Sequence, residues 1–350
     1  MPEVLLINSL THNPWNNLAL EDHLFELLVN RADGNSAQLG AILYLWQNDQ
    51  TVVIGRNQNA WVECNTAQLE ADGGFLARRT TGGGAVFHDL GNLCFSILLP
   101  QANFDVDRNF NFITKALIAE GIPAEKSGRN DILVDGQKFS GNAFRLNNGV
   151  GLHHGTFLVD SEFTRLARYL TVNPTKLQAK GIASVRSRVV NLITVKPDLT
   201  IRELEASIRK AFLAEFCSEG NWTVIEQTDA DYKNDKAYQE RCAKFASWEW
   251  RYGATIKFDA QVERRFSWGQ LQLGFSICRG RVETVQIWSD ALDTDFIEAI
   301  EAALPGTPFH SAELAKTVAN AVPDGDSPFG GCSRQEMAAE LQALLLEQGW

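Results

Sequence analysis

Apolar side chains recur along the first half of the chain with two spacings that predict different elements. Leucines three and four positions apart share a helix face, and they predict a helix after Pro14 at Leu20, Leu24, Leu27 and Leu28. Unbroken apolar runs predict buried strands over residues 41–46, 51–54 and 93–99. Residues 108–120 predict another helix. It ends at Gly121, because glycine readily adopts the left-handed backbone that closes a helix.

A tight hairpin is predicted where Asp135-Gly136 separates two strand-like runs, residues 131–134 and 137–144. Asp-Gly suits a type I′ turn, which needs positive φ at both central positions. A further strand is expected over residues 151–159. Strands precede and follow helices without a regular βαβ rhythm, which favours an α+β fold with a mixed or antiparallel sheet.

A capping box at Thr200 and Glu203 predicts a helix to about residue 216. The pattern changes in the last hundred residues. Short strands are expected there, over residues 255–258, 270–277 and 281–287, and helices over 295–303, 311–321 and after Ser333. A chain of 350 residues accommodates two domains. We therefore expect a large domain over 1–250 and a small α/β accessory domain over 251–350.

Composition and charge narrow the class of protein. Hydrophobic residues make up 45% and charged residues 21%, as in ordinary globular proteins. The net charge of -11 argues against a general nucleic-acid binder. The N-terminus lacks the basic segment of a signal peptide, and no apolar run approaches the ~18 residues of a membrane span. The six cysteines are scattered without C-x-x-C spacing. These features predict a cytoplasmic protein with reduced thiols and no membrane segment.

Residues 78–84, Arg-Arg-Thr-Thr-Gly-Gly-Gly, are the first stretch that carries chemistry. Consecutive glycines expose backbone N–H groups that can surround an anion, and arginines supply forked donors for phosphate or carboxylate. The alternative is a flexible glycine turn between strands at 75–78 and 85–87. The chain contains neither a P-loop nor a Rossmann glycine motif in the expected context. A nucleotide would therefore bind by another route.

Lys138 follows the predicted hairpin turn, and Asp131 precedes it. A lysine at this position can extend over a sheet face, and the small residues Gly141 and Ala143 leave room beside it. Asp131 on the neighbouring strand could hold the lysine or a magnesium ion. The alternatives are a surface lysine and a turn aspartate.

Two histidines and a basic segment complete the candidate features. His153 and His154 are adjacent on a predicted strand, so they point to opposite faces and make a poor metal pair. Gly155 suggests tight packing against the backbone. Residues 171–196 contain no acidic residue. They form either a solvated loop or a loop that closes over phosphates, with basic side chains at Lys176, Lys180, Arg186, Arg188 and Lys196.

Four stretches, in this order, resemble the lipoate–protein ligase family: RRTTGGGAVFHDLGN, SGRNDILVDGQKFSGNAF, HHGTFL and KLQAKGIASVRSRVVNL. The resemblance is dense over residues 4–195 and looser through 247–250 and 265–269. It implies a catalytic domain shared with biotin–protein ligases and octanoyl transferases, plus a small accessory domain. The implied reaction converts lipoate and ATP, with Mg²⁺, to lipoyl-AMP. The lipoyl group then passes to a lysine of an apo carrier domain of a 2-oxoacid dehydrogenase complex or the glycine cleavage system.

The resemblance also implies roles for individual residues. Lys138 is the implied catalytic residue, which bridges the acyl carbonyl and the α-phosphate, and Asp131 is the candidate metal ligand. The implied ATP-binding residues are Arg79, Gly84, Ala85, Val86, Phe87, Asp131, Lys138, Lys180, Arg186 and Arg188. The implied lipoate-binding residues are Trp46, Arg78, Gly83, His88, Lys138, His154 and Gly155.

The same scaffold also allows three other functions. An octanoyl transferase forms a thioester on a cysteine shortly after the histidine-glycine segment, but no cysteine occurs between Cys94 and Cys217. A biotin ligase carries a Gly-Arg-Gly-Arg-type loop, which is replaced here. A non-catalytic ligand-binding regulator would be expected to lose Lys138 or the glycines. The prediction is thus an ATP-dependent, monomeric ligase without a nucleic-acid partner, and lipoate and octanoate both stay candidate substrates.

Overall fold

The computed structural model describes residues 1–31, 39–170, 189–218, 220–252, 259–327 and 331–350. The chain forms two compact units. The sheet unit comprises Met1–Val53, Trp61–Arg78 and Ala85–Arg251. The small unit comprises Ile54–Ala60, Arg79–Gly84 and Tyr252–Trp350. The small unit therefore takes in two short segments from the first hundred residues, one of which holds the glycine run.

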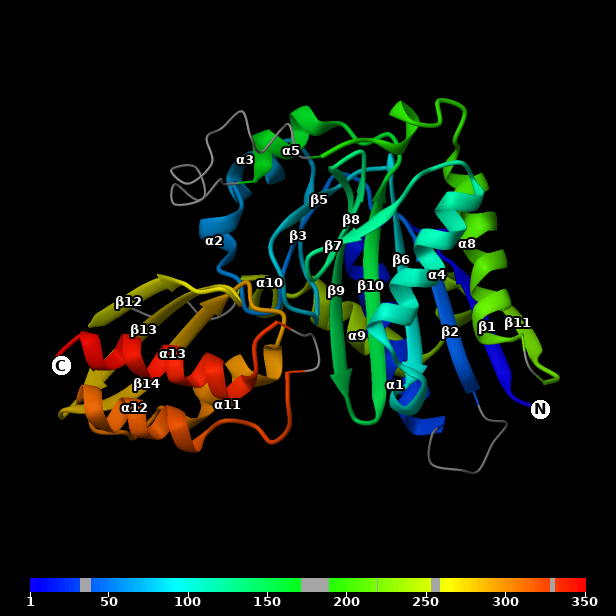
Figure 1. The fold of residues 1–350 in the computed structure, drawn as a ribbon. Helices are drawn as coiled ribbons and strands as arrows, with labels where there is room; N and C mark the ends of the chain where they lie inside the picture. The colour runs from blue at the N-terminus through cyan, green and yellow to red at the C-terminus, as the bar shows by residue number, and fades with distance from the viewer. Residues whose placement is uncertain (32–38, 171–188, 219, 253–258, 328–330) are drawn as a thin grey trace. The chain divides into compact units, whose positions relative to one another are not determined.

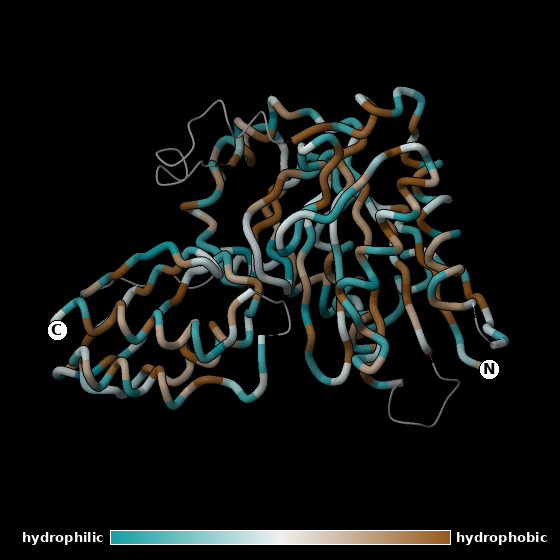
Figure 2. Tube along the Cα trace, in the orientation of Figure 1, coloured by the Kyte–Doolittle hydropathy of each residue, from teal (hydrophilic) through white to brown (hydrophobic). Residues whose placement is uncertain are grey.

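An eight-stranded mixed sheet forms the centre of the sheet unit (Figure 1). Strand β1 pairs in parallel with both of its neighbours, and the remaining pairs are antiparallel. The strand order is β11 (Thr223–Thr228), β1 (Glu3–Asn8), β2 (Leu39–Trp46), β6 (Asn92–Pro100), β10 (Val150–Leu158), β9 (Gln137–Asn147), β8 (Asp131–Val134), β7 (Glu125–Ser127). The predicted mixed sheet and α+β class are confirmed, and the most apolar strands, β2 and β6, are neighbours near its middle (Figure 2).

Helices cover both faces of this sheet. Helix α1 (Pro14–Arg31), the predicted leucine-rich helix, packs on β2, β6 and β10. Helices α4 (Val106–Ala119) and α8 (Ile201–Phe216) pack on each other, and α8 also contacts β2. The capping box at Thr200 and Glu203 is present, because each side chain accepts from the other residue's backbone N–H. The predicted ends of both helices agree with the structure to within two residues.

The hairpin between β8 and β9 has the predicted turn. Asp135 has φ 50° and Gly136 has φ 73°, as a type I′ turn requires. A second, three-stranded sheet has the order β4 (Phe75–Arg78), β3 (Thr51–Ile54), β5 (Val86–His88). Several short helices were not predicted from the pattern: α2 (Ala60–Glu63), α3 (Thr66–Ala71), α5 (Phe163–Tyr169), α9 (Lys236–Ala246), α10 (Trp248–Tyr252) and the 3₁₀ turns Gln101–Asn103, Leu192–Thr194 and Asp229–Tyr232.

The small unit has its own sheet and hydrophobic core. Three antiparallel strands, β12 (Ala260–Arg265), β13 (Gln270–Cys278) and β14 (Arg281–Ser289), pack with α11 (Thr294–Ala303), α12 (Ser311–Asn320) and α13 (Arg334–Glu347). Buried Arg334 donates to both carboxylate oxygens of Asp293, at 2.8 and 3.0 Å. The capping box at Ser333 is also present. The strand predicted over 255–258 lies outside the described residues.

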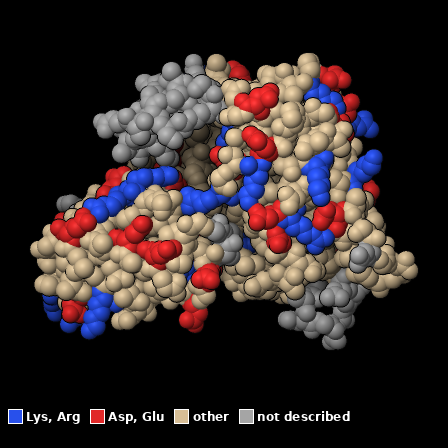
Figure 3. Space-filling model, in the orientation of Figure 1, with Lys and Arg blue, Asp and Glu red and all other residues tan. Residues whose placement is uncertain are grey.

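None of the helices in the described part of the chain combines the length and hydrophobicity that a membrane crossing requires. On the face of the sheet unit that Figure 3 shows, acidic and basic side chains are intermingled. This mixture is typical of an ordinary charged protein surface.

Candidate functional site

Lys138 and Asp131 form an ion pair beside the hairpin. Their strands are neighbours in the sheet, and the distance from Lys138 Nζ to Asp131 Oδ1 is 2.6 Å. Each side chain is about one-third exposed, at 34% and 36%. The sequence left open whether Asp131 holds the lysine or a metal ion, and in this structure it pairs with the lysine.

The Lys138 side chain extends over Gly141, three residues further along the same strand. A Cβ added to Gly141 would lie 3.1 Å from Lys138 Nζ. Gly141 shares a sheet face with Ala143, and Ala143 lies directly opposite His154 on β10. Lys138 Nζ therefore lies on the same face of the sheet as the His154 side chain.

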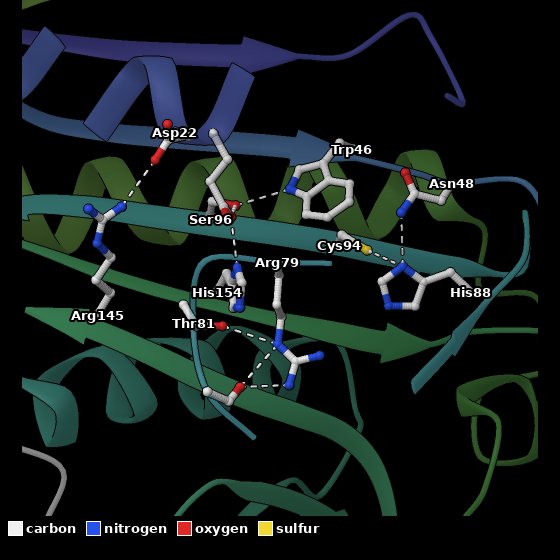
Figure 4. A network of polar contacts seen from close by, with 12 residues as sticks. Asp22, Trp46, Asn48, Arg79, Thr81, His88, Cys94, Ser96, Arg145 and His154 are labelled. Atoms are coloured by element: carbon white, nitrogen blue, oxygen red, sulfur yellow. Dashed lines mark hydrogen bonds and ion pairs between the residues drawn. The ribbon is translucent and has the colours of Figure 1, made fainter. Parts of the chain in front are cut away.

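A buried polar network continues on this face (Figure 4). Glu21 of α1 is 1% exposed and its Oε1 lies 2.8 Å from His154 Nδ1. The same oxygen accepts from Ser96 Oγ at 2.5 Å, and Ser96 Oγ accepts from Trp46 Nε1 at 3.0 Å. Among the described residues, Glu21 Oε2 has no hydrogen-bond partner. A buried carboxylate oxygen of this kind is costly without a partner, which makes this network a candidate place for a ligand's polar group.

Glu21 was not predicted as a site residue, although its position in the sequence indicates that its carboxylate is buried. It lies three and seven positions before Leu24 and Leu28, so it belongs to the apolar face of α1. A carboxylate on an otherwise apolar, buried helix face rarely occurs without a partner.

His153 and His154 point to opposite faces of the sheet, as predicted. His154 faces Glu21 of α1, whereas the His153 ring lies 5.0 Å from the Phe110 ring of α4. The tight packing predicted at Gly155 is also confirmed, because a Cβ there would lie 2.4 Å from Asn142 Oδ1 and 2.7 Å from the Phe95 ring.

His88 ends strand β5 and is also buried. Its Nδ1 lies 3.2 Å from Asn48 Nδ2 and 3.5 Å from Cys94 Sγ (Figure 4). The His88 and Trp46 rings pack edge to face at 6.2 Å. The structure thus brings His88 and Trp46, two of the predicted lipoate-binding residues, into contact. Burial raises the pKa of the Cys94 thiol well above its ordinary range.

Arg78 is directed to the C-terminal end of the sheet unit. Its Nε donates to Trp250 O and its Nη2 donates to Arg251 O, each at 2.8 Å. Trp250 Nε1 donates back to Arg78 O at 2.9 Å. Arg78 is 6% exposed. In this structure it connects strand β4 to helix α10.

Arg79 belongs to the small unit with the glycine run. Its guanidinium donates to Thr81 Oγ1 (Figure 4). It also donates to the carbonyl oxygens of Gly82 and Gly84, and all these distances are between 2.6 and 3.1 Å. Arg79 is 6% exposed. The loop is therefore folded around its own arginine.

The glycines of the run differ in their surroundings. A Cβ on Gly82 would lie 2.1 Å from Ala291 O, and Gly83 has φ 90° and donates its N–H to Ala291 O. A Cβ on Gly84 would have no atom within 4 Å among the described residues. Gly84, unlike Gly82, therefore presents backbone with open space beside it among the described residues.

The other predicted nucleotide-binding positions divide into two groups. Val86 and Phe87 lie in β5 and pair with Val53 and Val52 of β3, and Ala85 precedes them. Lys180, Arg186 and Arg188, with most of the predicted closing loop, lie outside the described residues.

The described residues contain no group of three or more histidine, cysteine, aspartate or glutamate side chains arranged to hold a metal ion. Mg²⁺ at phosphate-transfer sites is commonly held by one or two carboxylates and the substrate phosphates. A single partly exposed carboxylate such as Asp131 fits that pattern. It does not fit a site in which the protein supplies all the ligands.

Two family models match the chain. The lipoyl protein ligase A/B catalytic domain matches residues 13–213, and the bacterial lipoate protein ligase C-terminus matches residues 255–340. A crystal structure of P. falciparum LipL1 in complex with lipoate is 30% identical, covers 99% of this chain and 100% of that chain, and has a TM-score of 0.83.

Two further structures are 25% identical. The bi-partite lipoate protein ligase of Thermoplasma acidophilum covers 74% of this chain and 99% of that chain, with TM-score 0.59. A lipoate-protein ligase A bound with ATP covers 72% of this chain and 99% of that chain, with TM-score 0.57. A large mixed sheet with a small antiparallel-sheet unit is thus the lipoate ligase fold. The chain belongs to the lipoate–protein ligase family, which confirms the resemblance of its motifs.

Proposed function

We propose that the protein attaches lipoate to a lysine of a carrier domain in two steps that consume one ATP. First, a carboxylate oxygen of lipoate attacks the α-phosphorus, the bond to the β-phosphate breaks, and lipoyl-AMP and pyrophosphate form. Second, the acceptor lysine nitrogen attacks the acyl carbon and loses a proton, and AMP leaves. Negative charge builds up on phosphate and carbonyl oxygens in these steps, so fixed cations are the main requirement.

The observation that carries this proposal is the position of Lys138. Its ammonium group is held over Gly141 by Asp131, on the same sheet face as the His154 network. Trp46 adds a large apolar surface to that network. A cation for the carboxylate and an apolar surface for the tail are what an acyl-adenylate-forming site needs.

For ATP we propose Arg79, Asp131, Lys138 and the backbone of residues 84–87, joined by Lys180, Arg186 and Arg188. The open space at Gly84 supports close approach of a phosphate to the backbone. Bound magnesium would neutralise charge on the phosphates, with Asp131 as its protein ligand. The ATP-bound and lipoate-bound relatives support ATP and lipoate as substrates.

For lipoate we propose Trp46, Arg78, Gly83, His88, Lys138, His154 and Gly155. We also propose residues 1–250 as the catalytic domain, residues 251–350 as an accessory domain, and a cytoplasmic monomer that acts on apo lipoyl domains of 2-oxoacid dehydrogenases or the glycine-cleavage carrier. The T. acidophilum ligase, described together with its E2 lipoyl domain, supports such an acceptor.

The rival octanoyl transferase gains no support from the cysteines. Cys94 is 1% exposed, and burial keeps its thiol neutral by raising its pKa. A neutral, inaccessible thiol is a poor nucleophile for a thioester intermediate.

The deciding experiment is incubation of the protein with ATP, magnesium, lipoate and an apo lipoyl domain, followed by intact-mass measurement. We expect a lipoyl mass increment on the acceptor that requires ATP. Acylation of the acceptor from an octanoyl thioester without ATP would support the transferase instead. Lipoate binding without adenylate or pyrophosphate would support the non-catalytic regulator.

A further inference from the structure

His153 is a polar side chain enclosed by aromatic rings. It is 0% exposed, and its ring centre lies 5.4 Å from Phe95, 5.0 Å from Phe110 and 4.6 Å from Phe144. Its Nε2 lies 2.9 Å from Asn142 Oδ1. The proposed chemistry does not use this residue, and burying an imidazole in an apolar enclosure costs free energy unless the imidazole is hydrogen-bonded.

The hydrogen-bond partners of Asn142 fix the direction of this bond. Asn142 Nδ2 lies 3.1 Å from Asn130 O, a carbonyl oxygen that can only accept. The Asn142 amide nitrogen therefore faces Asn130, and its oxygen faces His153. Nε2 of His153 must carry the hydrogen and donate it. Nδ1 is then bare, and it has no hydrogen-bond partner among the described residues.

Asn142 and Asn130 are joined by three hydrogen bonds, which connect β9 to the residue just before β8. Asn142 N also donates to Asn130 O at 2.9 Å, and Asn130 Nδ2 donates to Asn142 O at 3.0 Å. Asn130 immediately precedes Asp131, and Asp131 pairs with Gly141. These three bonds hold the backbone next to the carboxylate that binds Lys138.

The connection is placed where the sheet register is irregular. The β8–β9 pairing shifts between Ile132 and Leu133, so the ladder is disrupted one residue beyond Asp131. Because the regular ladder is interrupted there, the Asn130–Asn142 bonds add a constraint next to the irregular position. Gly155 completes the arrangement, because any side chain there would collide with Asn142 Oδ1.

We propose that His153 and Asn142 are positioning residues for adenylate formation. The His153 N–H orients the Asn142 amide, Asn142 holds Asn130, and the carboxylate of Asp131 is thereby held where it aligns the Lys138 ammonium. The proposal rests on the proposed function for the reaction it serves. The hydrogen-bond chain itself can be tested without activity.

The kinetic test compares His153→Phe with His153→Gln in lipoate-dependent ATP–pyrophosphate exchange. Phe fits the aromatic enclosure but lacks the N–H, whereas Gln retains an amide donor. We expect His153→Phe to lower kcat about 10- to 100-fold, the range for misplaced reacting groups, with KM for lipoate changed less than about twofold. His153→Gln should recover most of kcat. A change in KM alone, or a failure of Gln to exceed Phe, would overturn the proposal.

A double variant tests whether His153 acts through Asp131. In an Asp131→Ala background, His153→Phe should lower kcat no further, because coupled residues are not additive. A full additional loss would show that His153 acts by another route. If His153→Phe does not fold, Asn130→Ala at a half-buried turn tests the same chain and should also lower kcat without raising KM.

Two readouts separate this proposal from the proposed function. Histidine ¹⁵N NMR should show a proton on Nε2 and none on Nδ1 of His153. Hydrogen exchange of the peptide 128–142 should be faster in His153→Phe than in His153→Gln. If wild-type protein shows no pyrophosphate exchange, the proposed function fails while these readouts still decide the hydrogen-bond chain. The opposite tautomer, or equal hydrogen exchange in both variants, would overturn it.

Discussion

Lys138 lies in a sheet strand and Arg79 lies in a glycine-rich loop, and the two cations are held by different kinds of partner. Lys138 faces one carboxylate, and its side chain is 34% exposed. Arg79 is 6% exposed and donates to a hydroxyl and two carbonyl oxygens of its own loop. An ammonium group has three donors, so Lys138 keeps capacity for a ligand, whereas Arg79 must exchange loop partners for ligand oxygens.

This difference predicts which substitutions affect the reaction without affecting the stability of the fold. Removing the Lys138 ammonium leaves only a partly exposed carboxylate behind, which water can solvate. Removing Arg79 leaves the buried carbonyl oxygen of Gly82 and the partly buried one of Gly84 without this donor, and that cost falls on the fold. Lys138 variants therefore report on the reaction, and Arg79 variants report on both.

The largest expected effect follows from Lys138→Ala. Loss of one preorganised donor at a reacting oxygen commonly lowers kcat about 10²- to 10³-fold, and Lys138 is proposed to act in both steps. We expect adenylate formation to fall by at least that factor. Circular dichroism and the thermal midpoint should stay close to wild type. Lys138→Arg is the matched control, since it keeps the charge but changes its geometry. Pyrophosphate release at the wild-type rate in Lys138→Ala would remove the lysine from this role.

Arg79→Ala should combine a smaller kinetic effect with a loss of stability. Burial of unsatisfied carbonyl oxygens costs about 1–3 kcal/mol, so the thermal midpoint should fall. KM for ATP should rise if Arg79 donates to a phosphate as proposed. Calorimetry and pyrophosphate exchange with varied ATP measure the two effects. An unchanged midpoint would contradict the view that Arg79 organises the loop.

Much of the fold was predictable because periodicity and turn chemistry act locally. The leucine spacing of α1, the Asp-Gly turn before Lys138 and the capping box at Thr200 each appear as expected. Strand β11, at one edge of the sheet, and its neighbour β1 were not predicted. They are joined by parallel pairing between residues more than two hundred positions apart, for example Glu3 and Thr223, and no local pattern encodes such a partner.

The candidate site was only partly predictable for the same reason. The adjacency of Asp131 and Lys138 follows from one hairpin, and the structure confirms it. The sequence did not predict a role for Glu21, because its partner His154 is 133 positions away. Only the packing of α1 on the sheet brings the two residues together. The loop carbonyl oxygens that accept from Arg79 could not be predicted from the sequence either, since every residue has a backbone carbonyl.

Gly82 and Gly84 offer a matched pair within the Arg79 loop. Gly82→Ala would place a Cβ 2.1 Å from Ala291 O, whereas Gly84→Ala meets no described atom within 4 Å. Overpacking of this kind costs about 1–3 kcal/mol, so Gly82→Ala should lower the thermal midpoint and Gly84→Ala should leave it unchanged. If a phosphate approaches the backbone at Gly84, the second variant should raise KM for ATP. Equal midpoints in both variants would contradict the packing at Gly82.

The smallest expected effect is a pH dependence of the free energy of unfolding. It comes from His153, in the hydrogen-bond chain that holds Lys138, and not from the residues around Arg79. Burial, followed by the charges of His154 and Lys126, lowers the pKa of His153 well below the ordinary histidine value of about 6.5. The folded protein keeps His153 neutral, while the unfolded chain takes up a proton below about pH 6.5. This contribution to stability is therefore fully present above that pH and is lost as the pH falls toward the folded-state pKa.

One proton of this kind contributes at most about 1.4 kcal/mol per pH unit to the slope of unfolding free energy. Denaturant unfolding between pH 5 and pH 8 should show that slope below about pH 6.5 in wild type and in Arg79→Ala, because Thr81, Gly82 and Gly84 do not titrate in this range. It should be reduced in His153→Phe. Burial also lowers the pKa of His23, which affects all three proteins alike, so the difference between variants isolates His153. Equal slopes in wild type and His153→Phe would mean that the His153 imidazole titrates freely in the folded protein. The hydrogen-bond chain that holds Lys138 would then be no more sensitive to pH than the loop around Arg79.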